Sequence, residues 1–224
     1  MSAWAVLAAA GRGERLGSDR PKAFARLGGR PLLAESLERL EDSDWIDFIV
    51  IAAPAEWEEP AILLAEELGA GKVSSVVTGG ATRSESVREA MAEVADDAAV
   101  VLVHDAARPL IPGAVIERVL APLSEGWDGV VPGLPPSDTV KRVEGDRVVE
   151  TLPRGQLVAV QTPQAFIPSV LREALGGDVS AASDCASLVE ARGGRVKVVE
   201  GDRRLLKVTS VDDLALVETW LDQP

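Results

Sequence analysis

Short apolar segments alternate with amphipathic segments along most of the chain, and this rhythm constrains the fold more than any other feature of the sequence. The apolar segments are rich in Val, Ile and Ala without strict alternation, as is typical of strands buried on both faces. We expect strands at residues 6–9, 48–53, 73–77, 100–103, 129–131 and 157–160.

The intervening segments carry apolar residues at helical spacing, most clearly within 87–94 and 116–123. Strands that alternate with helices predict a mostly parallel sheet covered on both faces. The predicted fold class is therefore α/β, a Rossmann-like three-layer sandwich, with ligands at the carboxyl ends of the strands.

Composition narrows the range of functions. A chain of 224 residues with 46% hydrophobic content can bury one core, so we expect a single domain over residues 1–224. With one cysteine, Cys185, and one histidine, His104, a zinc site of His and Cys ligands is disfavoured, and a hard cation such as Mg²⁺ is the expected metal.

The net charge of −13 argues against a nucleic-acid partner. Neither a signal peptide nor an apolar run of roughly 20 residues is present, so we expect a cytoplasmic protein without a membrane partner.

A loop of small residues, 8–13, follows the first expected strand and precedes Pro21-Lys22. Small side chains let a ligand approach backbone N–H groups, and Arg15 and Lys22 can donate charge-assisted hydrogen bonds to phosphate oxygens. The pattern is neither G-x-G-x-x-G nor a Walker A loop. It indicates a triphosphate site, although an ordinary strand-to-helix turn with solvated basic side chains is the alternative. In an acidic chain, the clustering of basic residues over 12–22 favours the ligand site.

Two further loops follow expected strands and should reach the same edge of the sheet, namely Thr78-Gly79-Gly80 and the segment 104–109. An ionised Asp105 at the end of a buried strand requires a cation or hydrogen-bond donors, and its alternative role is to cap the following turn. We interpret His104 as a structural residue.

The segment 137–154 departs from this rhythm, because a Glu144-Gly145-Asp146 turn separates two β-rich runs. A hairpin with few core residues is marginal in water on its own. We expect a protruding β-arm, 137–154, that forms a dimer, with an exposed edge ribbon as the alternative.

Several motifs occur in the order found in one enzyme family. They are Ala8-Ala9-Ala10-Gly11, Pro21-Lys22, the His-Asp-Ala-Ala-Arg-Pro segment at 104–109, the Gln-Thr-Pro-Gln-Ala-Phe segment at 161–166, Ser183-Asp184, and 198–201 leading to Lys207-Val208-Thr209. The whole chain resembles 2-C-methyl-D-erythritol 4-phosphate cytidylyltransferase, a nucleotidyltransferase of the non-mevalonate route to isoprenoids. The resemblance implies transfer of CMP from CTP to methylerythritol 4-phosphate by direct attack of the acceptor phosphate, with release of pyrophosphate.

The resemblance also implies roles for individual residues. Arg15 and Lys22 would grip the triphosphate and stabilise the transition state, with Lys207 near the α-phosphate. Asp105 would lie near the ribose and the Mg²⁺ carried by the CTP phosphates, as the one candidate protein ligand of that ion. The other residues expected to bind CTP are Ala9, Ala10, Gly11, Gly13, Gly79, Gly80, Ser86 and Ala106.

By the same resemblance, the arm completes the acceptor site of a homodimer. Thr139 and Arg154 would reach over from the partner subunit, and Lys141 would lie near the acceptor phosphate. Dimerisation would then be required for activity.

Two positions depart from the family pattern. Leu205 stands where the family often has Asn, and Cys185 follows Ser183-Asp184 where an acidic residue is more usual. Two other functions stay open on the sequence alone: a ribitol-5-phosphate cytidylyltransferase, and a non-catalytic nucleotide-binding regulator.

Overall fold

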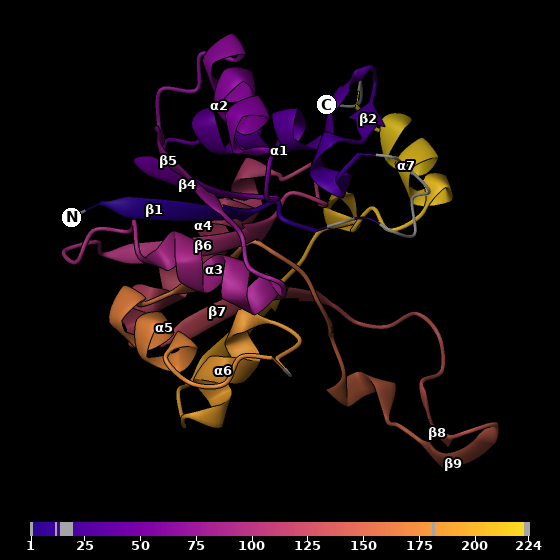
Figure 1. Ribbon diagram of the computed structural model, residues 1–224. Coiled ribbons are helices and arrows are strands. Elements are labelled where there is room, and N and C mark those ends of the chain that lie inside the picture. Colours follow the sequence, from indigo (N-terminus) through magenta and orange to yellow (C-terminus); the bar gives the residue numbers. More distant parts are fainter. Residues whose placement is uncertain (1, 12, 14–19, 181, 222–224) are drawn as a thin grey trace.

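An eight-stranded sheet forms the centre of the protein (Figure 1). The computed structural model describes residues 2–11, 13, 20–180 and 182–221. The strand order is β10-β7-β11-β6-β1-β4-β5, and β12 also pairs with β7. The strands are β1 (Ala3–Ala8), β4 (Phe48–Ala53), β5 (Val73–Thr78), β6 (Val100–Asp105), β7 (Gly129–Leu134), β10 (Ala159–Val160), β11 (Gln164–Phe166) and β12 (Val196–Glu200).

Most strand pairs are parallel. β1 pairs in parallel with β4 and β6, β4 with β5, and β12 with β7. Strand β11 runs antiparallel to both β6 and β7, and β10 runs antiparallel to β7. The carboxyl ends of β1, β4, β5 and β6 therefore meet at one edge of the sheet, as the sequence predicted.

Helices cover both faces. The helices are α1 (Leu32–Glu41), α2 (Glu58–Glu67), α3 (Arg83–Met91), α4 (Gly113–Leu120), α5 (Pro168–Leu175), α6 (Cys185–Ala191) and α7 (Val211–Glu218). Short 3-10 turns are η2 (Lys22–Phe24), η3 (Ala121–Glu125), η4 (Arg154–Gln156) and η5 (Arg203–Leu205), and β2 (Arg26–Leu27) pairs with β3 (Arg30–Pro31).

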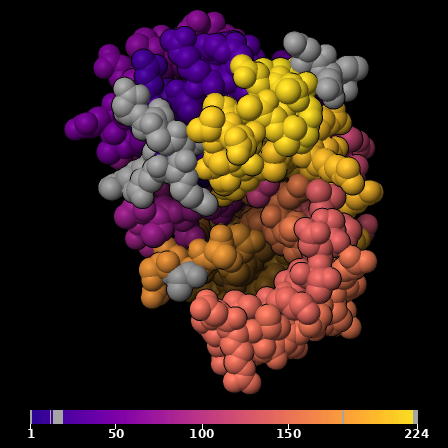
Figure 2. Space-filling model, turned by 90° about the vertical axis from the view of Figure 1, so that its right-hand side faces the viewer, coloured from indigo at the N-terminus to yellow at the C-terminus, as the bar shows by residue number. Residues whose placement is uncertain are grey.

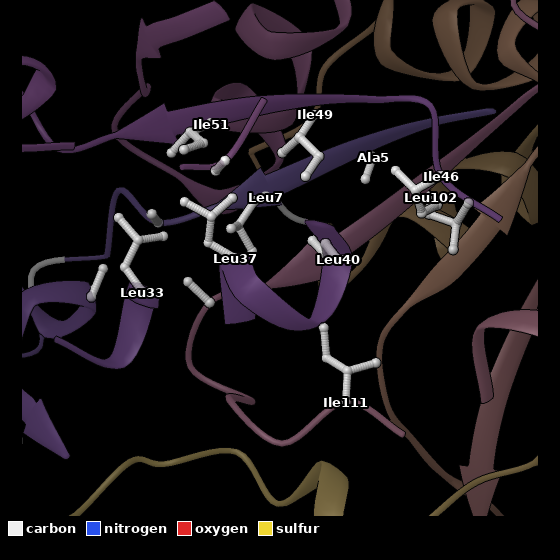
Figure 3. Close-up of a cluster of buried hydrophobic side chains, with 14 of the residues drawn as sticks. Ala5, Leu7, Leu33, Leu37, Leu40, Ile46, Ile49, Ile51, Leu102 and Ile111 are labelled. Carbon is white, nitrogen blue, oxygen red and sulfur yellow. The ribbon is translucent and has the colours of Figure 1, made fainter. Parts of the chain in front are cut away.

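The two faces of β1 show why its sequence reads as a continuous apolar run. Ala5 and Leu7 belong to the core beneath α1, α2 and α4, where Figure 3 shows Leu7 beside Leu37. Trp4 and Val6 belong to the opposite core, which α3, α5 and α6 cover. Successive strand residues point to opposite faces, so a strand between two cores has no polar side. The predicted α/β three-layer sandwich is confirmed.

The expected strands differ from the observed ones mainly in extent. Residues 48–53 match β4 at both ends, whereas the strand expected at 157–160 is reduced to the two residues of β10. The sequence analysis did not predict β11 or β12. Strand β11 has only three residues, and the edge strand β12 is partly exposed and mixes Lys and Glu with Val.

The segment 137–154 contains the expected hairpin, in which β8 (Lys141–Glu144) pairs antiparallel with β9 (Arg147–Thr151). Gly145 in the turn has φ 57°, the left-handed region that glycine tolerates. Every residue of the two strands is exposed, including Val143 and Val148, and Figure 1 shows β8 and β9 at the tip of a long excursion from the sheet. In the described part of the chain, no helix is both long enough and apolar enough to cross a bilayer.

Candidate functional site

A cavity of about 1150 Å³ opens at the edge where β1, β4, β5 and β6 end. It brings together most of the residues that the sequence analysis selected. Lining the cavity are Ala9, Ala10, Gly11, Gly13, Lys22, Gly79, Gly80, Ser86, Asp105, Ala106 and Lys207. The predicted Arg15 lies outside the described residues.

The small-residue loop and Lys22 are joined through the backbone. The N–H of Lys22 donates to the carbonyl of Gly11 at 3.2 Å. Gly13 has φ +72°, and a Cβ built there would lie 2.7 Å from Cβ of Lys22. A side chain at position 13 would therefore separate the loop from the segment that carries the cation.

The Gly79-Gly80 turn packs directly onto the first turn of α3. Thr82 and Glu85 form a capping box, and the Ser86 hydroxyl donates to the carbonyl of Thr82 at 2.8 Å. A Cβ at Gly79 would overlap Cβ of Ala10 and would lie 2.8 Å from Oγ of Ser86. Glycine at this position is what lets the first loop and the start of α3 meet.

Asp105, at the end of β6, is the electrostatic centre of the cavity. Its Oδ1 lies 2.6 Å from Nε of Arg83 and its Oδ2 lies 2.7 Å from Nζ of Lys207, while its side chain is only 8% exposed. Burial alone would raise the pKa of Asp105, but Arg83 and Lys207 outweigh it and hold that pKa well below its usual range. The carboxylate thus stays ionised, and each of its oxygens forms an ion pair with one cation.

The sequence analysis missed Arg83, the first residue of α3. Burial would lower the pKa of Arg83, but the Asp105 charge outweighs it and the pKa is raised. Its position offered a signal, because a cation in the first turn of a helix opposes the helix dipole and needs another reason to be there. Three further residues, Trp57, Thr209 and Glu56, line the cavity. Glu56 has φ 68°, in the left-handed region.

A hydrogen-bond chain fixes the backbone of Asp105. Its N–H donates to the Thr162 hydroxyl at 3.1 Å, and that hydroxyl lies 3.0 Å from Nδ1 of His104. Nε2 of His104 lies 3.0 Å from the carbonyl of Arg108, so Nε2 carries the proton and Nδ1 accepts from Thr162. Burial lowers the pKa of His104 to about 4. His104 is therefore a neutral, buried residue with both ring nitrogens satisfied.

A second cavity, of about 370 Å³, adjoins the first, and the two share Arg83, Asp105 and Lys207. Its remaining lining includes Arg108, Thr162, Gln164 and Asp184. The space-filling view shows the surface hollowed between the arm and the orange segments that follow it in the sequence (Figure 2).

Thr139 and Arg154 line neither cavity. Nη1 of Arg154 donates to the carbonyl of Ser137 at 2.7 Å, within the arm. A single chain does not bring these two predicted residues to the site, and their role stays a prediction.

The two departures from the family pattern lie beside the site. The buried Leu205 belongs to η5, and its carbonyl accepts from Nη1 of Arg108 at 2.5 Å. Cys185 begins α6, with Asp184 as the N-cap, and its Sγ lies 3.3 Å from Nη1 of Arg83. Leu205 therefore accepts a hydrogen bond from Arg108 through its backbone carbonyl, and Cys185 contacts Arg83, which pairs with Asp105.

Comparison with known proteins agrees with this geometry. The family model for IspD, 2-C-methyl-D-erythritol 4-phosphate cytidylyltransferase, matches residues 3–223. The chain belongs to this family. Among enzymes of that name, the one from Frankia casuarinae is 46% identical over an alignment that covers 97% of this chain and 80% of the relative. The one from Nocardia farcinica is also 46% identical, over 98% of this chain and 94% of the relative. The crystal structure of the enzyme from Thermus thermophilus superposes with a TM-score of 0.76 at 35% identity, covering 96% of both chains.

Protonation of His104 should govern the acid sensitivity of the cytidylyltransferase fold above pH 4. Because the folded pKa of about 4 lies below the ordinary value, the unfolded chain binds the proton first as pH falls. We expect the free energy of unfolding to fall by as much as about 3 kcal/mol between roughly pH 6.5 and 4. The lowered pKa of Asp105 adds to this loss from about pH 5 downward, as the unfolded carboxyl begins to bind protons.

The measurement is urea unfolding at a series of pH values, with His104→Gln beside the wild type. We expect a shallower slope for the variant between roughly pH 6.5 and 4, because the titrating ring is gone. An equal slope in the two proteins would assign the acid sensitivity to other groups.

Gly79→Ala should weaken CTP binding by about tenfold to a hundredfold, because the added Cβ forces the first loop and α3 apart. Isothermal titration with CTP measures the effect. Gly113→Ala, at the start of α4, is the matched control, because a Cβ added at Gly113 would meet nothing within 4 Å. Equal affinity of both variants would show that the contact at Gly79 does not shape the nucleotide site.

Proposed function

We propose that the protein transfers CMP from CTP to 2-C-methyl-D-erythritol 4-phosphate and releases pyrophosphate. The observation that carries this proposal is the buried Asp105 with its two cations at the end of β6, inside a cavity that the small-residue loop also lines. The relatives that bear this activity in their names match nearly the whole chain, which supports the choice of substrates.

The chemistry requires positioning and charge neutralisation more than covalent catalysis. An acceptor phosphate must approach the α-phosphorus of CTP although both are anions, and further charge develops on the departing pyrophosphate. Lys22 and Lys207 line the same cavity and supply positive charge for the two phosphates. The only histidine is buried, and both of its ring nitrogens already have hydrogen-bond partners within the protein, so we assign it no proton transfer.

Mg²⁺ carried by the CTP phosphates fits the residues present. Among the described residues, no group of three or more His, Cys, Asp or Glu side chains could hold a metal ion. Asp105 is the carboxylate beside the cations of the cavity, and both of its oxygens already pair with Arg83 and Lys207. A hard cation that Asp105 helps to hold would take its other ligands from phosphate and water. When bound, the ion would neutralise charge on the triphosphate.

Pyrophosphate release from CTP and Mg²⁺ tests the proposal, with methylerythritol 4-phosphate and ribitol 5-phosphate supplied in parallel. We expect release with the first acceptor, and a loss of roughly a hundredfold or more in the Lys22→Ala variant. Release with ribitol 5-phosphate alone would identify the protein as a ribitol-5-phosphate cytidylyltransferase instead. CTP binding without release in either reaction would identify a nucleotide-binding regulator.

We further propose that the arm pairs two subunits in the cytoplasm and delivers Thr139 and Arg154 to the partner's site. The exposure of Val143, Val148 and Val149 on a hairpin with no core of its own supports a partner surface. Within its own chain, Arg154 is held by the arm and lines neither cavity.

Mixing two inactive variants tests this sharing of residues. A dimer of one Lys22→Ala subunit and one Arg154→Ala subunit has one intact site if Arg154 acts in the partner. After exchange at equal amounts, about a quarter of the wild-type activity per subunit should return, because half of the dimers are mixed. No recovery, with mixed dimers verified by differently tagged subunits, would place Arg154 in its own chain's site. Wild-type activity of Arg154→Ala alone would place Arg154 outside the mechanism.

A further inference from the structure

We propose that Arg83 is a positioning residue for the transfer: it fixes the Asp105 carboxylate so that this carboxylate holds Lys207 at the boundary between the two cavities. This inference rests on the proposed function. It assigns a task to Arg83, a charged residue of the site that the sequence motifs did not identify.

Asp105 is held at three points. Its backbone N–H donates to Thr162, its Oδ1 meets Nε of Arg83, and its Oδ2 meets Nζ of Lys207. The backbone contact fixes where the side chain starts, but it leaves the carboxylate free to rotate about its last bond. The short contact with Arg83 removes that rotation and therefore decides where Oδ2 lies.

Arg83 itself is anchored for this purpose. It begins α3, whose first turn the capping box of Thr82 and Glu85 fixes. Its Nη1 contacts Sγ of Cys185, while Nη2 is buried with no hydrogen-bond partner among the described residues. Burial raises the pKa of the Cys185 thiol, so the thiol stays neutral. Asp105 is therefore the anion to which Arg83 is bound in the described part of the chain.

Lys207 is the most exposed member of the group. Its side chain is 41% exposed, against 21% for Arg83 and 8% for Asp105. Lys207 lines both cavities, and a phosphorus atom that passes between two substrates must lie near their boundary. A long side chain there needs a fixed counter-charge, because disorder of a catalytic cation by about 1 Å can cost on the order of a hundredfold in rate.

The kinetic test is a double-mutant cycle with Arg83→Gln and Lys207→Met. We expect Arg83→Gln to lower kcat by about tenfold or more while KM for CTP changes less than about threefold. The double variant should be no slower than Lys207→Met alone, because Arg83 acts through Lys207. Multiplied losses in the double variant, or a raised KM with unchanged kcat, would overturn the proposal in favour of independent or direct contact with substrate.

Two further variants keep the test decisive. If Arg83→Gln fails to fold, Arg83→Lys replaces it in the cycle, since an ammonium can contact Oδ1 without the planar fork, and an intermediate kcat is expected. Arg88→Gln is the matched control, because it makes the same change at an exposed arginine of α3 that pairs with Glu89. Its kcat should stay within about twofold of wild type, and a loss as large as that of Arg83→Gln would overturn the specific role of the Arg83–Asp105 pair.

A crystal structure of Arg83→Gln gives a readout that does not depend on activity. We expect a rotated Asp105 carboxylate and a displaced Lys207 Nζ. An unmoved Lys207 would overturn the inference, even for an active enzyme. Absence of CTP turnover in the wild type would instead reject the proposed function, while the displacement of Lys207 could still be observed.

Discussion

The ionised Asp105 carboxylate, buried between two cations, is the interaction on which the site depends. A carboxylate inside a protein is costly unless opposite charges and donors surround it. Here those groups come from distant parts of the chain: Arg83 from the start of α3, and Lys207 from the segment after η5. Satisfying one buried charge thus ties the middle of the chain to its C-terminal part, at the edge where the strands of the sheet end.

The neutral groups around Asp105 are as constrained as the charged ones. The Arg108 carbonyl can only accept, so it leaves the imidazole one tautomer, with the proton on Nε2; the Thr162 hydroxyl then donates to Nδ1 and accepts from Asp105. If the ring were protonated, both ring nitrogens would be donors, and the hydroxyl hydrogen of Thr162 would lose Nδ1 as its acceptor. Burial is the largest cause of the lowered pKa of His104, and it outweighs the hydrogen bond to the Arg108 carbonyl, which by itself would raise that pKa.

Much of this could be predicted from the sequence because it depends on local patterns. Doubly buried strands have an apolar signature, and loops after parallel strands must meet at one edge, which placed Gly79, Asp105 and the small-residue loop together. The strand β11 could not be found, because three residues carry no periodicity and its pairing with β6 and β7 is set by tertiary contacts. Arg83 was missed for a related reason: its importance comes from a partner 22 residues away, not from a motif.

Cys185, which stands where an acidic residue is more usual in the family, changes how the charge of Arg83 is neutralised. An acidic residue at that place would give Arg83 a second carboxylate, and the guanidinium would be shared between two anions. With a neutral thiol 3.3 Å from Nη1, the charge of Arg83 is directed to Asp105. Nη2 of Arg83 is a separate, buried donor without a hydrogen-bond partner in the described structure. A buried unpaired donor costs about 1–3 kcal/mol. The short ion pair with Asp105 offsets this cost, so the substitution shifts the balance of the site from shared neutralisation toward a single, firmly held carboxylate.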